Sequence, residues 1–209
     1  MTMASKRRRG RPPKEATGYN ETKKALIRAG LELLTEKGFS ATAIDQVLRR
    51  VDIPKGSFYH YFESKEAFGA ELIESYAAYF ARKLVYFLED ETMKPLERIQ
   101  AFAADAESGM ARHGYSRGCL VGNLGQEMNV LPESYRSKLE AVFVDWQERI
   151  ARCFRSAKDG GEIPEDADCE RLAAVFWIGW EGAVLRAKLE RSPVPLRLFL
   201  DFFFASLSR

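Results

Sequence analysis

The chain has 209 residues, of which 46% are hydrophobic and 30% charged, and its formal net charge is +2. This composition supports a packed core, and the length allows one or two domains. No apolar run reaches the roughly 18–20 residues that a membrane-spanning helix needs. The first residues are basic rather than apolar, unlike a secretory signal. We therefore expect a cytoplasmic protein without a membrane partner.

Catalytic signatures are absent from the sequence. There is no glycine-rich dinucleotide fingerprint, no phosphate-binding loop lysine motif, no zinc-protease motif and no hydrolase elbow. The two histidines, His60 and His113, lie far apart, and the three cysteines, Cys119, Cys153 and Cys169, have no metal-ligand spacing. We predict free thiols, no metal site, no cofactor and no enzymatic activity.

The charge is distributed unevenly along the chain. Residues 1–65 contain 14 lysines and arginines against 7 aspartates and glutamates, whereas the remainder contains 18 against 23. A basic front and an acidic back indicate that only the front meets nucleic acid.

Residues 1–18 form a basic tail that is rich in glycine, proline and charge, so we expect it to be disordered in the free protein. Its Arg9-Gly10-Arg11-Pro12 core resembles an AT-hook. In that interpretation Arg9 and Arg11 enter a narrow minor groove while Gly10 lets the backbone approach closely. The alternative is a tail that only attracts phosphates electrostatically.

The first predicted helix covers 21–37 and ends at Gly38, a residue type favoured just after a helix. A second helix is predicted from Thr42, its expected N-cap, to Val51, because Ile44, Val47, Leu48 and Val51 repeat with helical spacing. Pro54 then suits the first turn of another helix, which we expect to cover 54–62.

The 54–62 segment is predicted to read DNA. Phe58 and Phe62, four residues apart, can pack inward together with Tyr61. The residues left facing outward are then aromatic, basic or hydroxylic, which are groups that contact phosphates and bases in a major groove. The predicted DNA contacts in this segment are Lys55, Gly56, Ser57, Tyr59 and His60. Thr42, the expected N-cap of the preceding helix, is also a predicted DNA contact.

The stretch PKGSFYHYFESKEAF resembles the recognition helix and following helix of the TetR family of bacterial repressors. The resemblance implies an α-helical homodimer with an N-terminal helix-turn-helix domain, here 19–65, and a ligand-binding and dimerisation domain, here 66–209. It implies double-stranded operator DNA and a small organic effector as partners.

Helical periodicity continues to the end of the chain and no segment alternates with period two, so the predicted fold class is all-α. Ser64 is the expected N-cap of a long helix to about residue 89, and Lys65 at its start is a predicted phosphate contact. The resemblance implies that this helix is a lever between the two domains. Later helices are predicted over 95–113, 119–128, 132–160, 168–191 and 195–207.

The stretch RGCLVGNLGQEM at 117–128 predicts a short helix with a small, partly polar face, a plausible wall for a ligand pocket. A small carboxylate would need a cation that is shielded from water, and we expect Arg117, His113 or Arg186, in that order. The full predicted set is His113, Arg117, Cys119, Asn123, Gln126, Trp146, Trp177, Trp180, Glu181 and Arg186. For Glu181, a salt bridge with Arg186 or Lys188 is the alternative role.

Together with WIGWEGAVLRAKLE at 177–190, this stretch resembles the TetR-type repressors that respond to acrylate in bacteria degrading dimethylsulfoniopropionate, and more distantly those that sense electrophiles. Cys119 begins a predicted helix and follows Arg117 closely, and both features favour a reactive thiolate. Acrylate, however, is a poor electrophile once ionised. We therefore favour reversible binding of the effector. The alternative is covalent sensing, in which the effector adds to Cys119 and Lys188 is a second participant. A carrier or enzyme without a DNA role is the alternative from another class of protein.

The last predicted helix, LRLFLDFFFASL, is apolar on nearly every side. Such a helix must bury more than one face. Dimerisation would bury the second face, and the resemblance implies a four-helix interface made by the last two helices of each protomer. Two-fold symmetry then predicts a palindromic operator.

Overall fold

The structure is a computed structural model that describes residues 16–207; the predictions for Arg9, Arg11 and most of the basic tail lie outside the described residues. Within this range every regular element is helical, which agrees with the predicted all-α class. The elements are α1 (Ala16–Lys37), α2 (Ile44–Arg50), the 3-10 helix η1 (Lys55–His60), α3 (Lys65–Leu88), α4 (Pro95–Ala111), α5 (Leu120–Gln126), α6 (Ser134–Asp159), α7 (Cys169–Glu190) and α8 (Val194–Ser206).

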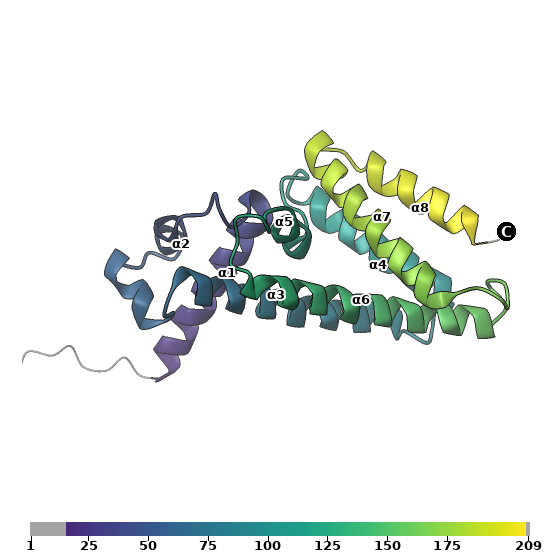
Figure 1. The fold of residues 1–209 in the computed structure, drawn as a ribbon, viewed down its shortest axis with the longest axis horizontal. Helices are drawn as coiled ribbons and strands as arrows, with labels where there is room; N and C mark the ends of the chain where they lie inside the picture. The colour runs from purple at the N-terminus through teal and green to yellow at the C-terminus, as the bar shows by residue number, and fades with distance from the viewer. Residues whose placement is uncertain (1–15, 208–209) are drawn as a thin grey trace, which may run out of the picture.

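The molecule is elongated, with α1, α2 and η1 at one end (Figure 1). Helices α3 and α6 run side by side along its length, and α7 packs on α6 and carries α8 on its outer side. The short helix α5 lies between the two ends and contacts α1, α3 and α6. This position makes α5 a structural link between the N-terminal helices and the rest of the protein.

Local sequence signals set several helix ends as predicted. Gly38 follows α1 with a φ of 82°, a conformation that glycine adopts without strain. The Ser64 hydroxyl accepts a 2.9 Å hydrogen bond from the backbone N–H of Ala67 and caps α3. Asp168 caps α7 in the same way through the N–H of Arg171.

Two predictions about the helix-turn-helix were wrong. Thr42 does not cap α2; Ala43 occupies the N-cap position. The Thr42 hydroxyl instead donates to the Gly38 carbonyl at 2.6 Å, and the side chain is buried, so it is unavailable to DNA. The 54–62 segment is not an α-helix, because i to i+3 bonds such as Ser57 N–H to the Pro54 carbonyl close its turns.

Two aromatic clusters form the core. At the N-terminal end, Phe58, Phe62 and Phe68 contact one another and are buried. Further along, Trp146 packs in tilted ring contacts against Phe80 and Trp177. None of the described helices is long and apolar enough to cross a membrane.

Candidate functional site

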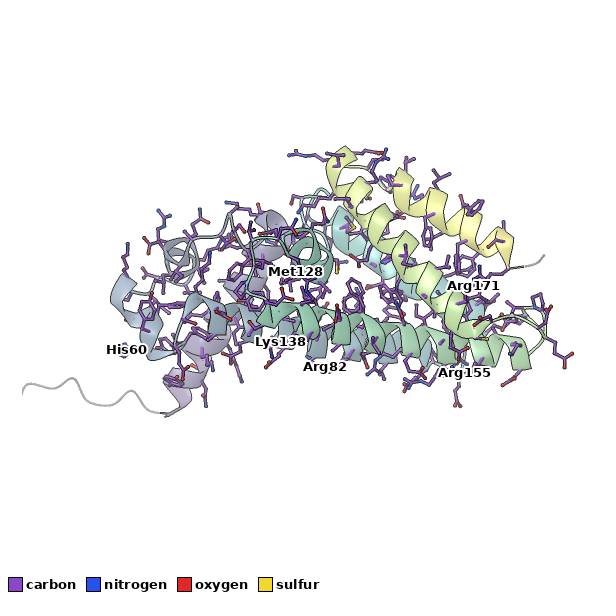
Figure 2. All side chains as sticks on the ribbon, in the orientation of Figure 1. His60, Arg82, Met128, Lys138, Arg155 and Arg171 are labelled. Atoms are coloured by element: carbon purple, nitrogen blue, oxygen red, sulfur yellow. The ribbon has the colours of Figure 1, made fainter. Side chains whose placement is uncertain are left out.

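The exposed face of η1 and its neighbours forms the first candidate site. Phe58 points inward and is fully buried, so its neighbours in the turn face outward. Tyr59 is 66% exposed, and the Lys55 side chain is 82% exposed. His60 is also exposed and lies at the tip of the molecule (Figure 2). This end of the molecule therefore presents a lysine, a phenol and an imidazole to solvent on one short turn.

Other contacts hold this turn in place. The Tyr19 hydroxyl donates to the His60 carbonyl at 3.1 Å, and the Tyr19 ring stacks on Tyr61. The Lys55 ammonium pairs with Asp45 of α2 at 2.7 Å. An exposed pair of this kind contributes at most about 1 kcal/mol, so a phosphate could compete for the ammonium.

Lys65 differs from its predicted role as a phosphate contact. Its ammonium donates to the Phe39 carbonyl at 3.1 Å and lies 4.4 Å from the centre of the Phe39 ring. Burial lowers the pKa of Lys65, and the nearby Glu127 carboxylate opposes that shift. Lys65 thus joins α3 to the turn after α1 instead of projecting into solvent.

The second candidate site is a partly open cavity of about 250 Å³ lined by α1, α3, α4, α7 and the segment that precedes α5. Its volume corresponds to about eight water molecules and is below the range of roughly 300–1,000 Å³ typical for drug-sized ligands. The lining residues are Thr35, Tyr76, Tyr79, Phe80, Lys83, Ala106, Gly109, Met110, Arg112, His113, Arg117, Gly118, Cys119, Trp180, Glu181 and Val184. The cavity therefore suits a small molecule.

Basic side chains occupy one part of the lining. Lys83 forms an ion pair with Asp105 of α4. Arg117 lies 3.5 Å from Glu32 of α1, and the same Glu32 carboxylate pairs with Arg50 of α2 at 3.0 Å. Lys83, Arg112 and Arg117 can supply positive charge to an anionic ligand, His113 adds an imidazole to the same lining, and Arg117 reaches the N-terminal helices through Glu32.

Three acidic or weakly acidic groups, Glu181, Cys119 and Tyr76, lie close together on another part of the lining. Glu181 is partly buried and lines the cavity. Burial raises its pKa to about 7, and a hydrogen bond with Cys119 partly offsets that shift. Burial also raises the pKa of Tyr76, and the proximity of the acidic groups Cys119 and Glu181 raises it further. At neutral pH much of Glu181 is therefore protonated and can donate a hydrogen bond.

The prediction that Cys119 favours its thiolate was wrong. Its pKa is raised well above the ordinary value, first by burial and then by the charge of Glu181. The N–H of Gly122 contacts the sulfur at 3.5 Å, which is too weak to reverse those effects. Arg117 pairs with Glu32 rather than with the sulfur, and the Lys188 ammonium donates to the Thr35 carbonyl at 3.3 Å.

Five predicted ligand residues lie in the lining, namely His113, Arg117, Cys119, Trp180 and Glu181. Arg186 does not, because it pairs with Glu190 on the outer side of α7. Asn123 is also outside; its amide donates to the carbonyls of Leu34 and Thr35 in α1.

Two tryptophans and one glutamine were likewise misplaced by the prediction. Trp146 and Trp177 are buried in the aromatic core, and neither indole N–H has a hydrogen-bond partner. Gln126 is exposed and bonds to the Gly122 carbonyl. Helical spacing placed these side chains on shared faces, but it could not indicate which neighbouring helix each face meets.

Sequence reasoning missed the part of the lining that α3 and α4 contribute. Tyr76, Tyr79 and Phe80 were not among the predicted ligand residues, and neither was Lys83, which follows them on the same helix. The available signal was a lysine next to a tyrosine-rich stripe in the middle of a long helix. Among the described residues no cluster of histidine, cysteine, aspartate or glutamate could hold a metal ion.

Comparison with known proteins defines the class. Residues 26–72 match the family model of bacterial regulatory proteins of the tetR family, and residues 95–203 match that of the tetracyclin repressor-like C-terminal domain. The chain is 52% identical over 202 residues to "Transcriptional regulator AcuR" of Cereibacter sphaeroides, covering 97% of this chain and 92% of that protein. It is 32% identical to "HTH-type transcriptional repressor DhaR" of a Mycobacterium species, covering 87% of this chain and 90% of that one.

A crystal structure of "regulatory protein TetR from Rhodobacter sphaeroides" superimposes with a TM-score of 0.86 at 54% identity, covering 87% of this chain and 96% of that one. The fold, with η1 (Lys55–His60) as the exposed recognition turn of a helix-turn-helix, defines a transcriptional regulator. The chain belongs to the TetR family, whose matched members are regulators rather than enzymes.

Proposed function

We propose that the protein is a homodimeric repressor that leaves a palindromic operator when a small carboxylate, acrylate or a close relative, occupies the inner cavity. The observation that carries this proposal is the pairing of a small cavity lined by Arg112, His113 and Arg117 with an exposed recognition turn at the far end of the same chain. Residues 19–65 would then bind DNA, and residues 66–209 would bind the effector and the second protomer.

The cavity chemistry supports a carboxylate effector. A carboxylate can accept hydrogen bonds from Arg117, while a short apolar chain packs on Phe80, Met110 and Trp180. Protonated Glu181 would offer a donor instead of a repelling charge. The small volume disfavours bulky effectors.

The exposed faces of α7 and α8 support a dimer. Ile178, Leu189, Leu198 and Phe202 are each about 70% exposed or more. Isolated monomers rarely leave so many large apolar side chains in water on adjoining helices. A second protomer packed there places two recognition turns on one side of DNA. The effector then releases the operator by binding more tightly to a dimer whose turns no longer match two successive major grooves.

Lys55→Ala and Tyr59→Phe should each weaken operator binding while the protein stays folded and dimeric. Loss of one phosphate contact by Lys55→Ala should lower the slope of log affinity against log salt by about one unit. Fluorescence anisotropy at several salt concentrations measures both quantities. Lys138→Ala, which removes an exposed lysine from α6, is the control. Unchanged affinity and slope in both variants would remove η1 from the DNA interface.

Cys119→Ser should keep effector-driven DNA release, with a shifted effector affinity. The raised pKa of Cys119 leaves its sulfur protonated and unreactive at neutral pH, so the effector binds reversibly beside it. Intact-protein mass spectrometry of the wild type after incubation with acrylate should find no added mass. A stable adduct on Cys119, together with a Cys119→Ser variant that stays on DNA, would contradict reversible sensing.

A further inference from the structure

The helix α5 connects the cavity to the helix-turn-helix. Its N-cap residue, Cys119, lines the cavity, and its C-cap residue is Glu127. Eight residues of helical rise separate the two by about 12 Å. Leu120, Val121 and Leu124 are completely buried, so α5 is fixed along one side. α5 is thus one continuously packed element between its two ends.

At the cavity end, α5 lies directly against Glu181. A Cβ added at Gly122 would overlap the Glu181 carboxylate, so that carboxylate packs directly on the backbone of α5 and would have to shift to make room for a side chain there. The N–H of Gly118, in the segment leading into α5, donates to the Thr35 carbonyl of α1 at 3.1 Å. A ligand that moves Glu181 therefore acts on α5 without an intermediate residue.

At the other end, Glu127 holds the turn between α1 and α2. Its two carboxylate oxygens accept hydrogen bonds from the backbone N–H groups of Phe39 at 3.0 Å and Ser40 at 2.8 Å. A side chain at Gly38 would occupy the place of that carboxylate. Lys65, at the start of α3, donates to the carbonyl of the same Phe39. One carboxylate thus fixes the turn from which the helix-turn-helix begins.

We propose that Glu127 is a positioning residue that couples the effector cavity to the helix-turn-helix through α5, in parallel with the long helix α3. The inference rests on the proposed function, since it describes how occupancy of the cavity reaches the DNA-binding end. Carboxylates bound by two backbone N–H groups make strong, directional contacts. The cavity, α5 and the turn then have two joint arrangements, one compatible with operator DNA and one with bound effector.

The first test compares operator affinity with and without saturating sodium acrylate in the wild type, Glu127→Ala and Glu127→Gln. The ratio of the two dissociation constants is the coupling factor, which we expect to be on the order of 100 in the wild type. In Glu127→Ala it should fall at least about tenfold, while acrylate affinity of the free protein changes less than about threefold. Glu127→Gln keeps the volume and one acceptor oxygen and should give an intermediate factor, which guards against a folding defect.

The matched control is Glu133→Gln, which makes the same charge change as Glu127→Gln. Glu133 is an exposed glutamate six residues after Glu127 and pairs with Arg136. This variant should leave the coupling factor at the wild-type value. A Glu127→Ala protein with the wild-type coupling factor would overturn the proposal. That result includes a variant whose DNA affinity changes equally with and without acrylate, which is what a purely structural role of Glu127 predicts.

A second test needs no effector. Cys119→Leu enlarges a cavity-lining side chain at the start of α5. Operator affinity is measured for three proteins, namely Cys119→Leu, Glu127→Ala and the double variant, and compared with the wild type. Residues this far apart normally give additive effects, within about twofold in affinity. Transmission through α5 predicts a departure of at least about threefold, and additivity would contradict it. A wild type that ignores acrylate would refute the proposed effector, while this cycle would still decide the role of α5.

Discussion

Replacing Phe202 by glutamate should make the protein monomeric and weaken operator binding at least about 100-fold. Phe202 is 76% exposed on α8, four residues after Leu198, and Ile178 on α7 is 73% exposed. In a dimer the introduced carboxylate would be buried without a partner, which costs far more than a surface substitution. A monomer binds one half-site and loses the gain of simultaneous binding, which is typically 100-fold or more.

Analytical ultracentrifugation and anisotropy on the operator measure the two effects. The control is Tyr86→Glu, because Tyr86 is 75% exposed but lies on α3. That variant should remain dimeric and keep its DNA affinity within a few-fold. A Phe202→Glu protein that sediments as a dimer would place the interface elsewhere.

Glu181→Gln should stabilise the protein by about 3 kcal/mol at pH 8 and by less than about 1 kcal/mol at pH 5. The pKa of Glu181 is raised to about 7 in the folded protein, above its ordinary value of 4.5 in an unfolded chain. The protonated form is therefore favoured by folding. Its contribution is complete below pH 4.5 and is lost as the pH rises toward 7, at about 1.4 kcal/mol per pKa unit. Glutamine cannot ionise, so the variant avoids this loss.

Urea unfolding of both proteins from pH 5 to pH 8 gives the free energies of unfolding. Glu74→Gln, an exposed glutamate paired with Lys138, is the control and should show no comparable pH dependence. Equal effects of Glu181→Gln at pH 5 and pH 8 would mean that Glu181 titrates normally. The same ionisation bears on sensing, since a charged Glu181 would repel a carboxylate effector above pH 7.

The sequence predicted those parts of the fold that depend on neighbours along the chain. Gly38 ends a helix and Ser64 begins one because the backbone freedom of glycine and the short polar side chain of serine act within one turn. The burial of Phe58 and Phe62 follows from their spacing. Thr42 was misassigned because its hydroxyl has two nearby options, and the Gly38 carbonyl competes with capping.

The cavity was only half predictable for a physical reason. The segment before α5 contributes His113, Arg117 and Cys119, which lie near one another in the sequence and were predicted, although Cys119 is the only residue of the predicted 119–128 helix that lines the cavity. Tyr76 and Lys83 join it only because α3 passes beneath that segment, a tertiary arrangement that periodicity does not encode. For the same reason Asn123 was predicted to face a ligand, whereas α1 lies there and uses its amide.

Titrating acrylate into the preformed complex between the protein and its palindromic operator tests the central claim most directly. Acrylamide, which has nearly the same shape without the negative charge, is the matched ligand control. A carboxylate-sensing cavity predicts that acrylate releases the operator and lowers DNA affinity on the order of 100-fold at saturation, whereas acrylamide at equal concentration leaves the complex intact. An operator complex that persists at saturating acrylate, or that acrylamide dissociates equally well, would contradict the account.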